Sequence, residues 1–581
     1  MARTKHNNTD GGGNLFGDML QESTADEKSG PVTVLGMTFA DDDERRAYFR
    51  SELREKLPEL RKIEGFPIGS DDDIINLSDP PYYTACPNPW LNDFIAQWEK
   101  EKIQLQAEGK RNPDFEVTKP YIGDISEGKR NPIYDAHSYH TKVPHPAIMR
   151  YILHYSQPGD IIFDGFCGTG MTGVAAYLCG CPDVNLKAKI NQEFKNSTKA
   201  IEWGERHAIL TDLSPVASLI AAEYNTPAIS RQPLKELSSE ISQLEAKLDW
   251  MYETNDSSGH TFTINYTVWS DVFICPNCGD EFVFYNVAVK PDGKVLDTFN
   301  CPHCNCSLNK KGLEKKWTSY FDFTLNKVCR TIEKVPVLIN YSNGTRGSIV
   351  KIPSELDLNV ISRASSLARD FNLTIQRMME GNEARRNDKQ GLTHVHHFYF
   401  DRTLVVLQNL LSKKNISKEL RFLVNAQLIN ISKLNRYRPG VSFPYNPLSG
   451  TLYIGSQISE ANTFVALENK LKKIEAVFSI LDAHNCVGIN SATYLNLQSN
   501  SIDYIFTDPP FGANISYSEL NFIQESWLNL TTNYEKEAIE NTSHNKTKET
   551  YSALMSQSLL EFYRILTQLS SYRVYPFLDY R

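Results

Sequence analysis

The chain has 581 residues and a net charge of −9, and 41% of its residues are hydrophobic. This length exceeds what one hydrophobic core supports, so we expect several domains, and the negative charge excludes a protein coated in positive charge for non-specific nucleic-acid binding. No stretch reaches the roughly 18 apolar residues of a membrane span, and the polar start lacks the apolar core of a signal peptide. We therefore expect a cytoplasmic protein with no membrane partner, whose eleven cysteines are reduced.

The first 135 residues precede the main α/β pattern. Residues 1–30 are rich in Gly, Asn, Asp and Ser, and we expect them to form a disordered tail. Residues 31–135 are predicted to form an N-terminal region. It contains a charged helix over 41–60, the motif SDPPYY at 78–83 and a linker-like stretch from 108 to 135.

A parallel α/β sheet is predicted for residues 136–230, because helix, strand, glycine turn, helix and strand follow one another there. The apolar strand 161–163 leads into a glycine turn, and the strand 208–212 ends in an acid. Bare glycine backbone lets a cofactor lie close to the chain, and the helix that begins near Met171 points its amide groups at the ligand. The predicted cofactor-binding residues are Asp164, Gly165, Phe166, Gly168, Gly170, Thr172 and Asp212.

The sequence GTGMTG within this turn also matches the glycine pattern of dinucleotide-binding proteins. Those proteins place an acid about 20 residues after the motif. Asp212 lies about twice as far away, with a polar, lysine-bearing insert between. An acid at the end of the second strand suits a ribose in either case, so a dinucleotide oxidoreductase remains the least favoured alternative.

Two Cys-Pro-x-Cys pairs lie within residues 231–330, after a helix expected at 231–249. Paired cysteines separated by strand-like sequence such as EFVFYNVAV are typical of a zinc ribbon. We predict a structural zinc ion held by Cys275, Cys278, Cys301 and Cys304, with Cys306 as a spare that could replace Cys304. This insert either only stabilises the fold or takes part in target recognition.

A second insert, residues 331–440, is expected to be mainly helical over 355–437 and is a candidate for target recognition. Two clusters are candidates for a local basic groove, although such clusters are more often solvated faces. They are Lys310, Lys311, Lys315 and Lys316, and Arg436 with Arg438 beside Tyr437.

Residues 441–581 return to the strand pattern, at 492–497 and 502–507. The second run, IDYIFTDPPF, ends in Asp508, Pro509, Pro510 and Phe511. A buried parallel strand would place Asp508 at its carboxyl end, and prolines, which cannot donate a backbone hydrogen bond, leave their carbonyls free to face a crevice. The pattern predicts a site built from hydrogen-bond acceptors.

These motifs together carry a family resemblance. DGFCGTG at 164–170 resembles the cofactor motif of S-adenosylmethionine-dependent methyltransferases. TDPPF at 507–511 resembles the catalytic motif of the branch that methylates exocyclic amino groups of DNA. The segment 140–153 is similar to the one that precedes the cofactor strand in that family and helps to hold the methionine end.

The resemblance implies an α/β, Rossmann-like methyltransferase sheet, S-adenosylmethionine as cofactor, and double-stranded DNA as partner with the target base flipped out. Adenine N6 is favoured over cytosine N4, because the motif begins with Asp rather than Ser. The family's sheet has more strands than this chain supplies after Asp508, where a helix over 551–569 is followed by at most one strand. We therefore expect a catalytic half, 441–581, that is incomplete at its C-terminal end. Another chain, or a subunit of a restriction or defence system, would be its partner.

The chemistry explains why the motif needs an acid, a carbonyl and a ring. The amino groups of adenine and cytosine are poor nucleophiles, because their lone pair is delocalised into the ring. Asp508 and the Pro509 carbonyl can each accept one N–H and so aim the lone pair at the methyl group, while Phe511 stacks on the base. The alternative is a permuted strand order in which the first motif is catalytic, through Asp79, Pro80, Pro81 and Tyr82. Asp508 is preferred, because 502–507 is expected beside 161–163 at the switch point of the sheet.

Other activities remain open at this point. The same chemistry could act on RNA, or the chain could be a catalytically inactive zinc-ribbon subunit that binds nucleic acid. Carbon-5 cytosine methylation is excluded by the absence of a Pro-Cys dipeptide, and radical chemistry by the absence of a Cys-x3-Cys-x2-Cys cluster.

Overall fold

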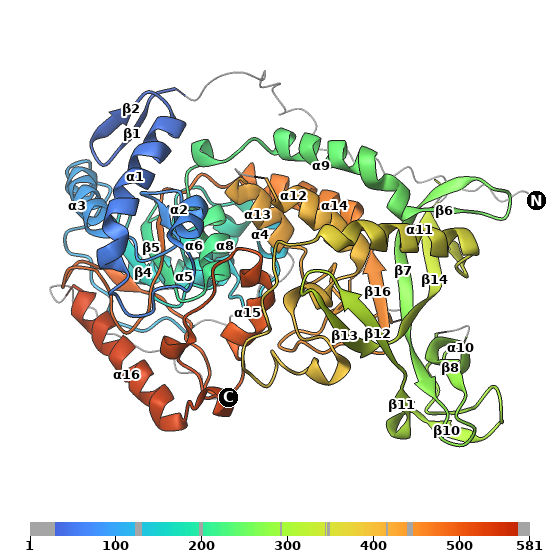
Figure 1. Ribbon diagram of the computed structural model, residues 1–581. Coiled ribbons are helices and arrows are strands. Elements are labelled where there is room, and N and C mark those ends of the chain that lie inside the picture. The colour runs from blue at the N-terminus through green and yellow to red at the C-terminus, as the bar shows by residue number, and fades with distance from the viewer. Residues whose placement is uncertain are drawn as a thin grey trace, which may run out of the picture.

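The protein is described by a computed structural model that covers residues 30–122, 131–196, 201–290, 293–342, 344, 349–413, 416–438 and 445–567. Two sheets organise it: a parallel sheet in the body and an antiparallel sheet in the insert (Figure 1). The expected N-terminal tail lies outside the described residues, apart from Gly30. So does the stretch 570–581, for which one further strand was expected.

The parallel sheet has the strand order β18-β4-β5-β17-β3. Its strands are short, apolar and mostly buried on both faces, as is typical of parallel sheets covered by helices. Their bounds are β3 (Tyr83–Thr84), β4 (Ile161–Asp164), β5 (His207–Asp212), β17 (Cys486–Ile489) and β18 (Tyr504–Ile505). All four pairings are parallel, with Tyr504 opposite Ile162 and Val487 opposite both Leu210 and Tyr83. The predicted α/β class and the place of 502–507 beside 161–163 are thus confirmed.

Helices surround this sheet, and α6 and α8 pack directly on its central strands. The helices of the body are α4 (Pro132–Asp135), α5 (His145–Tyr155), α6 (Met171–Leu178), α7 (Val184–Glu193), α8 (Pro215–Asn225), α14 (Thr463–Phe478), α15 (Tyr517–Ser526) and α16 (Lys548–Ile565). The N-terminal lobe comprises β1 (Val32–Val34), β2 (Met37–Phe39), α1 (Asp42–Leu60), α2 (Asp71–Leu77) and α3 (Leu91–Ala107). Within the described residues no helix is long and apolar enough to cross a membrane.

The antiparallel sheet was not predicted from the sequence. Its central strand is β7, which pairs with β14 along most of its length and also with β6, β8, β11 and β16. The strands of the insert are β6 (Glu253–Asn255), β7 (Thr261–Ile274), β8 (Glu281–Val283), β9 (Thr298–Asn300), β10 (Ser307–Asn309), β11 (Glu314–Lys315), β12 (Trp317–Asp322), β13 (Lys327–Ile332), β14 (Lys334–Ser342), β15 (Ile349–Lys351) and β16 (Gln457–Ala461). Its helices are α9 (Leu234–Leu248), α10 (Phe284–Ala288), α11 (Glu355–Leu367), α12 (Asp401–Leu411) and α13 (Lys418–Asn425).

Three expected elements differ from the structure. The third strand of the parallel sheet is β17, not 492–497, whose backbone bonds instead to α16: Arg564 donates to the Leu495 and Leu497 carbonyls. EFVFYNVAV is strand only at β8 and then turns into α10. The helical content expected over 355–437 is confined to α11, α12, α13 and short 3₁₀ turns, with a long irregular stretch between.

Beyond β18 the sheet continues only briefly among the described residues. Leu566 forms a parallel bridge with Ile502, and the backbone N–H of Thr567 donates to the Ile502 carbonyl at 2.8 Å. Helix α16 therefore returns the chain to the free side of β18, which is the direction of a further parallel strand.

Candidate active site at the carboxyl edge of the parallel sheet

The predicted motifs meet where the parallel strands end. β4 ends at Asp164, β5 at Asp212, and Asp508 follows shortly after β18. Because parallel strands present their carboxyl ends at one edge, where α/β proteins bind ligands, the three acids lie at the same edge, and two of them, Asp212 and Asp508, line a pocket there. The pocket there encloses about 730 Å³ of empty space, its open mouth included. It is lined by Gly165, Phe166, Gly168, Asp212, Asp508 and Pro510, and also by Tyr139, Thr141, Ser214, Asn490, Ser491, Thr493, Tyr517, Thr532, Lys536 and Glu537.

The Asp164 carboxylate joins the two motifs. It is buried and accepts hydrogen bonds from the Thr172 hydroxyl at 2.5 Å, the Phe166 backbone N–H at 3.2 Å and the Thr507 hydroxyl at 3.0 Å. Burial raises its pKa to about 7, against the opposing effect of these donors. Asp164 and Thr172 were predicted to bind the cofactor, but neither lines the pocket. The geometry instead gives them the task of fixing the glycine turn, the start of α6 and the end of β18 relative to one another.

The glycines of the turn divide between two tasks. Gly168 has φ +50° and lies on the pocket wall, where an added Cβ would meet only the Tyr139 ring, at 3.7 Å. Gly170 has φ +72° and lies off the pocket, and a Cβ there would come within 2.6 Å of Asn225 and 2.8 Å of Ala221 in α8. The turn therefore presents bare backbone to a ligand at Gly168, while Gly170 is needed for close packing of the turn on α8.

Asp212 closes the turn from the neighbouring strand. Its carboxylate accepts the Gly168 backbone N–H at 2.9 Å and the Ser214 backbone N–H at 2.9 Å, and burial raises its pKa to about 6. Next to it, the buried Asn490 lines the pocket, and its side-chain carbonyl oxygen has no hydrogen-bond partner. This oxygen is therefore a buried acceptor without a protein partner at the pocket wall.

Asp508 sits at the mouth of the pocket. Its side chain is exposed, but neighbouring atoms partly remove water from the carboxylate, and this desolvation raises its pKa above the usual value. The Pro510 carbonyl accepts the Tyr551 hydroxyl at 2.9 Å. Phe511 is 57% exposed and does not line the pocket. An aromatic wall is supplied instead by Tyr139 and Tyr517, which the sequence did not single out.

The first proline motif lies at the opposite edge of the sheet. Asp79 precedes β3, whose chain direction matches that of β17, so the motif enters at the amino edge. Arg45 donates to both acceptors that a target amino group would need: the Asp79 carboxylate at 2.8 Å and the Pro80 carbonyl at 2.5 Å. Tyr82 is buried and does not line the pocket.

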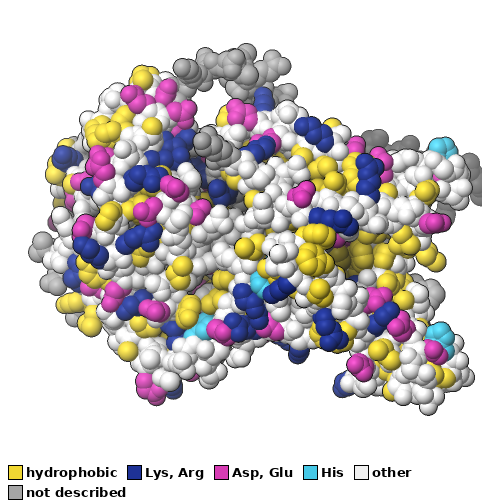
Figure 2. All heavy atoms as spheres, in the orientation of Figure 1, with side chains coloured by type: hydrophobic (Ala, Val, Ile, Leu, Met, Phe, Trp, Pro, Cys, Tyr) yellow, Lys and Arg dark blue, Asp and Glu magenta, His cyan; other side chains and the backbone are white. Residues whose placement is uncertain are grey.

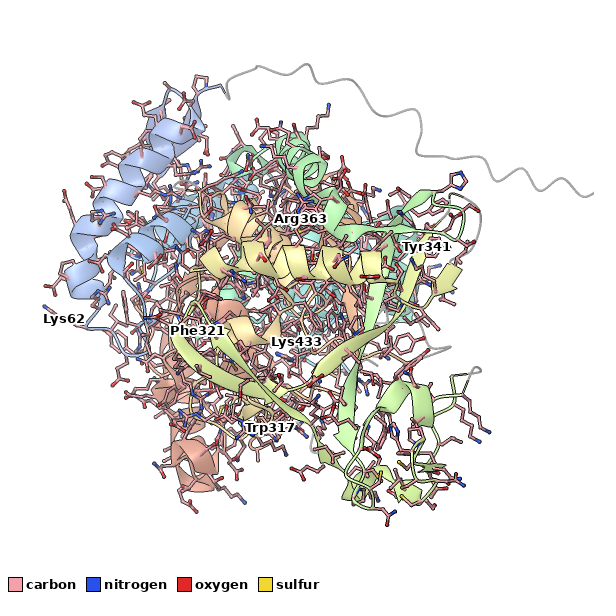
Figure 3. The ribbon with its side chains drawn as sticks, turned by 45° about the vertical axis from the view of Figure 1, so that its right-hand side comes forward. Lys62, Trp317, Phe321, Tyr341, Arg363 and Lys433 are labelled. Atoms are coloured by element: carbon pink, nitrogen blue, oxygen red, sulfur yellow. The ribbon has the colours of Figure 1, made fainter. Side chains whose placement is uncertain are left out.

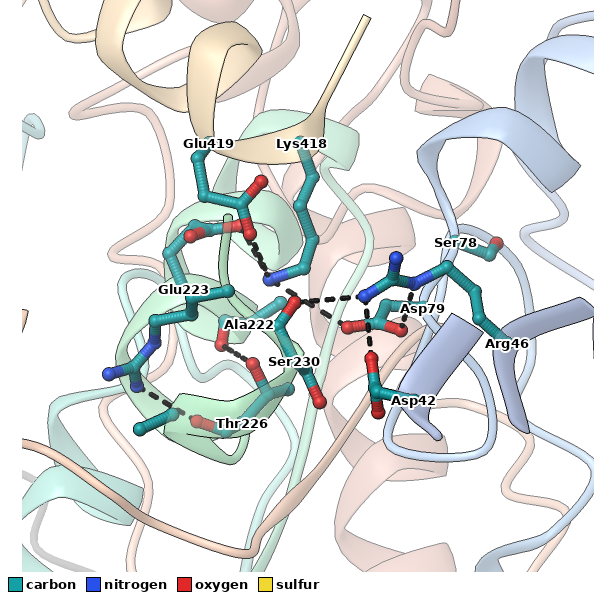
Figure 4. Close-up of polar contacts among 12 residues, drawn as sticks. Asp42, Arg46, Ser78, Asp79, Ala222, Glu223, Thr226, Ser230, Lys418 and Glu419 are labelled. Atoms are coloured by element: carbon teal, nitrogen blue, oxygen red, sulfur yellow. Dashed lines mark hydrogen bonds and ion pairs between the residues drawn. The ribbon is translucent and has the colours of Figure 1, made fainter. Parts of the chain in front are cut away.

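Asp79 belongs to a buried network of charges (Figure 4). It also pairs with Arg46 at 3.2 Å and with Lys418 at 3.7 Å. Burial alone would raise the pKa of Asp79, but the charges of Arg45, Lys418 and Arg46 outweigh it and hold the pKa well below the usual range. Asp79 is therefore a permanent anion that ties α1 and α13 to the start of β3.

The four predicted cysteine ligands come together. The Sγ atoms of Cys275 and Cys304 are 3.7 Å apart, and those of Cys278 and Cys301 are 3.8 Å apart. A tetrahedral site with Zn–S bonds of about 2.3 Å has S···S edges of about 3.8 Å, so these thiols fit a zinc ion. All four ligand atoms lie within 4.8 Å of one another.

The fifth cysteine, Cys306, lies beside this cluster, 3.5 Å from Cys275 and 3.3 Å from Cys304. The Asn277 side chain donates to Cys304 and lowers its pKa to about 6, whereas the hydrogen bond with Cys304 raises the pKa of Cys306 to about 12. By geometry, Cys304 rather than Cys306 completes the group of four cysteines whose sulfur atoms lie within 4.8 Å of one another.

A second group of potential metal ligands was missed in the sequence. The Asp322 carboxylate lies 3.0 Å from His396 Nε2 and 2.8 Å from His397 Nε2, and all three side chains are buried. His397 Nδ1, however, accepts the backbone N–H of Thr393 at 3.1 Å, so its proton is on Nε2. A metal ligand would need that nitrogen bare. The group is a hydrogen-bonded clamp in which both rings hold Asp322.

The lysine cluster that was one candidate for a basic groove is largely engaged by groups of the insert itself. Lys315 pairs with Asp271 at 2.7 Å, and Lys316 pairs with Glu281 at 2.6 Å. Lys310 lies over the ring of Phe284, 4.4 Å from its centroid. Most of this cluster therefore stabilises the insert rather than offering unpaired charge.

Comparison with known proteins adds one finding. Residues 59–181 match a family model described as DNA methylase. The match supports an amino-methyltransferase family, with DNA as the substrate that the family suggests. The matched range contains the Asp79 motif and the glycine turn, and it ends before Asp212 and Asp508. No curated protein and no solved structure matches the chain.

Proposed function

We propose that the chain transfers a methyl group from S-adenosylmethionine to an exocyclic amino group of DNA, with adenine N6 as the favoured target. One observation carries this proposal. The glycine turn and Asp508 line one pocket at the carboxyl edge of the sheet, and Thr507 bonds to Asp164 to join the two motifs.

The pocket residues suit the methyl donor. Bare backbone at Gly165 and Gly168 lets a ligand lie on the turn, and Asp212 is the acid for the ribose hydroxyls. The unpartnered oxygen of Asn490 is an acceptor for a buried N–H donor. When bound, S-adenosylmethionine supplies an electrophilic methyl group.

The role of Asp508 follows from its place and its surroundings. It can accept one N–H of the target amino group, and the carbonyl of Pro509 can accept the other, which directs the nitrogen lone pair out of the ring plane. The Pro510 carbonyl is already engaged by Tyr551 and so does not compete. The raised pKa of Asp508 also favours taking up the proton that the amino group loses. We propose that Tyr139 and Tyr517, which line the pocket, stack on the flipped base, and that the exposed Phe511 covers it from outside the pocket lining.

We also propose that Cys275, Cys278, Cys301 and Cys304 hold one structural zinc ion, because their sulfur atoms fit a closed tetrahedral site. Four protein ligands leave no open position, so the metal would stabilise the insert and take no part in methyl transfer.

The test has two stages. Calorimetry with S-adenosylmethionine measures cofactor binding in the purified chain. Unmethylated DNA is then incubated with a radiolabelled methyl donor, digested to nucleosides and analysed by mass spectrometry, which separates N6-methyladenine from N4-methylcytosine. RNA of matched sequence is the control substrate. Failure to bind the methyl donor, or label in RNA but not in DNA, would contradict the proposal.

A further inference from the structure

The hairpin formed by β12 and β13 has one packed face and one open face. Within the described ranges its strands pair only with each other, with Ser319 opposite Arg330 and Phe321 opposite Val328. Side chains alternate between the faces of a strand, so Tyr320 and Asp322 share one face while Phe321 and Arg330 share the other.

The packed face is fixed to the body of the protein. Asp322 is held by His396 and His397, and the Tyr320 ring lies edge-on to His397 at 6.3 Å. At the tip, the Thr324 hydroxyl donates to the Phe371 carbonyl at 2.9 Å. The Phe371 ring in turn contacts Trp527, which follows α15 in the catalytic half. The hairpin is therefore a rigid element connected to the part of the protein that carries the candidate site.

The open face combines exposed rings with arginines. Phe321 is 44% exposed, Phe323 49% and Val328 69%. Phe321 and Phe323 contact each other edge-to-face at 5.0 Å. Arg330 lies over the Trp317 ring at 5.2 Å, and Arg369 lies over Phe323 at 5.0 Å. We call this set, Trp317, Phe321, Phe323, Val328, Arg330 and Arg369, the hairpin face.

Its charge is not neutralised. Arg330 and Arg369 are exposed, and within the described chain neither forms an ion pair with a carboxylate; the adjoining Asp370 pairs with neither. This contrasts with Lys315 and Lys316 of the same insert, which are both paired with acids. Figure 3 labels Trp317 and Phe321 towards the two ends of β12, and Figure 2 shows basic and apolar side chains interspersed over this region of the surface.

We propose that the hairpin face contacts DNA: bases stack on Phe321 and Phe323, and the unpaired guanidinium groups of Arg330 and Arg369 neutralise phosphates. Aromatic rings interleaved with unpaired arginines are the combination by which proteins hold nucleic-acid strands, since every base offers a face for stacking and every phosphate a charge. The choice of DNA as the nucleic acid rests on the proposed function. An apolar protein partner would not require the two unpaired charges.

The experiment measures binding of a fluorescent DNA duplex, and of its separated strand, by anisotropy at several salt concentrations. The Phe321→Ser, Phe323→Ser double variant should bind the separated strand about tenfold more weakly or worse, because its unpaired bases lose their stacking partners. The Arg330→Ala, Arg369→Ala variant should lower the slope of log affinity against log salt by up to about 2, because each phosphate contact contributes about 0.9. Both variants should bind S-adenosylmethionine as the unaltered chain does.

Two matched controls isolate the hairpin. Arg363 of α11 lies over the Trp250 ring at 3.9 Å, which makes it an exposed stacked arginine elsewhere in the insert. Tyr48 of α1 is 43% exposed, which matches the exposure of Phe321. Arg363→Ala and Tyr48→Ser should leave DNA affinity unchanged, and thermal melting checks that each variant is folded.

Several outcomes would overturn the inference. Unchanged DNA affinity in both double variants would overturn it, and so would an unaltered chain that binds no DNA at all. In either case, calorimetry with S-adenosylmethionine still tests the proposed function separately. A loss of self-association in the phenylalanine variant with unchanged DNA binding would assign the surface to a second copy of the chain instead. Conversely, hairpin-dependent DNA binding in a chain that does not bind S-adenosylmethionine would leave this inference standing and refute the proposed methyl transfer.

Discussion

Replacing Asp508 and Asp79 by alanine, one at a time, should give opposite results. Asp508 is exposed and forms no hydrogen bond or ion pair within the described chain, so its loss leaves no partner unsatisfied. The free energy of unfolding should then change by less than about 0.5 kcal/mol. If Asp508 accepts an N–H of the target mainly in the transition state, kcat should fall by about 100-fold or more, as for the loss of one preorganised hydrogen-bond partner. Affinity for S-adenosylmethionine should stay the same.

Asp79→Ala should act on stability. The Asp79 side chain is fully buried, and its removal leaves Arg45, itself fully buried, with Asp42 as its one anionic partner among the described residues. Breaking a buried ion pair by removing one partner costs about 3–5 kcal/mol, because the other charge remains buried. Chemical denaturation should show this loss, while kcat of the folded fraction should be close to that of the unaltered chain.

The assay pairs denaturation curves with methyl transfer at saturating DNA and methyl donor, on the same preparations. An Asp79→Ala variant that keeps its stability but loses methyl transfer, together with an Asp508→Ala variant that retains transfer, would contradict both expectations. That result would mean that the amino edge of the sheet, with Arg45 displaced, is the catalytic one.

Three further predictions address the rest of the structure. Thr507→Val should lower kcat about tenfold with little change in KM, and Thr507→Ser should restore it; equal loss in both variants would argue against the hydrogen bond to Asp164. Cys304→Ser should reduce the zinc content found by elemental analysis, whereas Cys306→Ser should retain one zinc per chain; the reverse would make Cys306 the ligand. His145 and His396 are buried, which lowers the pKa of each imidazole to about 4 in the folded protein. In the unfolded chain a histidine has a pKa of about 6.5, so below that pH the unfolded state binds more protons than the folded state. Each histidine should therefore lower the free energy of unfolding by about 3 kcal/mol between pH 7 and pH 4. Denaturation midpoints that stay constant from pH 7 to pH 4 would contradict the prediction for the two histidines.

The sequence predicted the positions of those site residues that lie at or just after the end of a strand. Asp164 and Asp212 each end an apolar run, and Asp508 follows one closely, so their meeting at one edge follows from parallel pairing alone. What each acid does there was not predictable in the same way. Asp164 is turned away from the pocket by three donors, one of them, Thr507, from a distant part of the chain.

Contacts between distant parts of the chain determine the conformation of the segments that the sequence did not predict correctly. The stretch 492–497 alternates apolar residues as a strand would, and Leu495 and Leu497 are indeed buried, but side chains of α16 take up its backbone groups. Similarly, SDPPYY has the composition of the second proline motif, and only the position of β3 shows that it enters the sheet at the amino edge. The long strand β7 is rich in aromatic and β-branched residues, so its own sequence carries a strand signal just before the first cysteine pair.

The pairing of β5 with β17 has a consequence for how the protein is made. The backbone N–H of Ala208 in β5 donates to the side chain of Asn485, 277 residues further along the chain. During synthesis, β4 and β5 can pair with each other, but their outer neighbours β18 and β17 are made much later. The side of β5 that faces β17 is therefore an open parallel edge until the whole antiparallel insert has been translated. Such distant pairing makes folding slow. The length of the insert thus determines how long the incomplete sheet is exposed to aggregation during synthesis. Fragments that end before β17 should depend on chaperones to remain in solution.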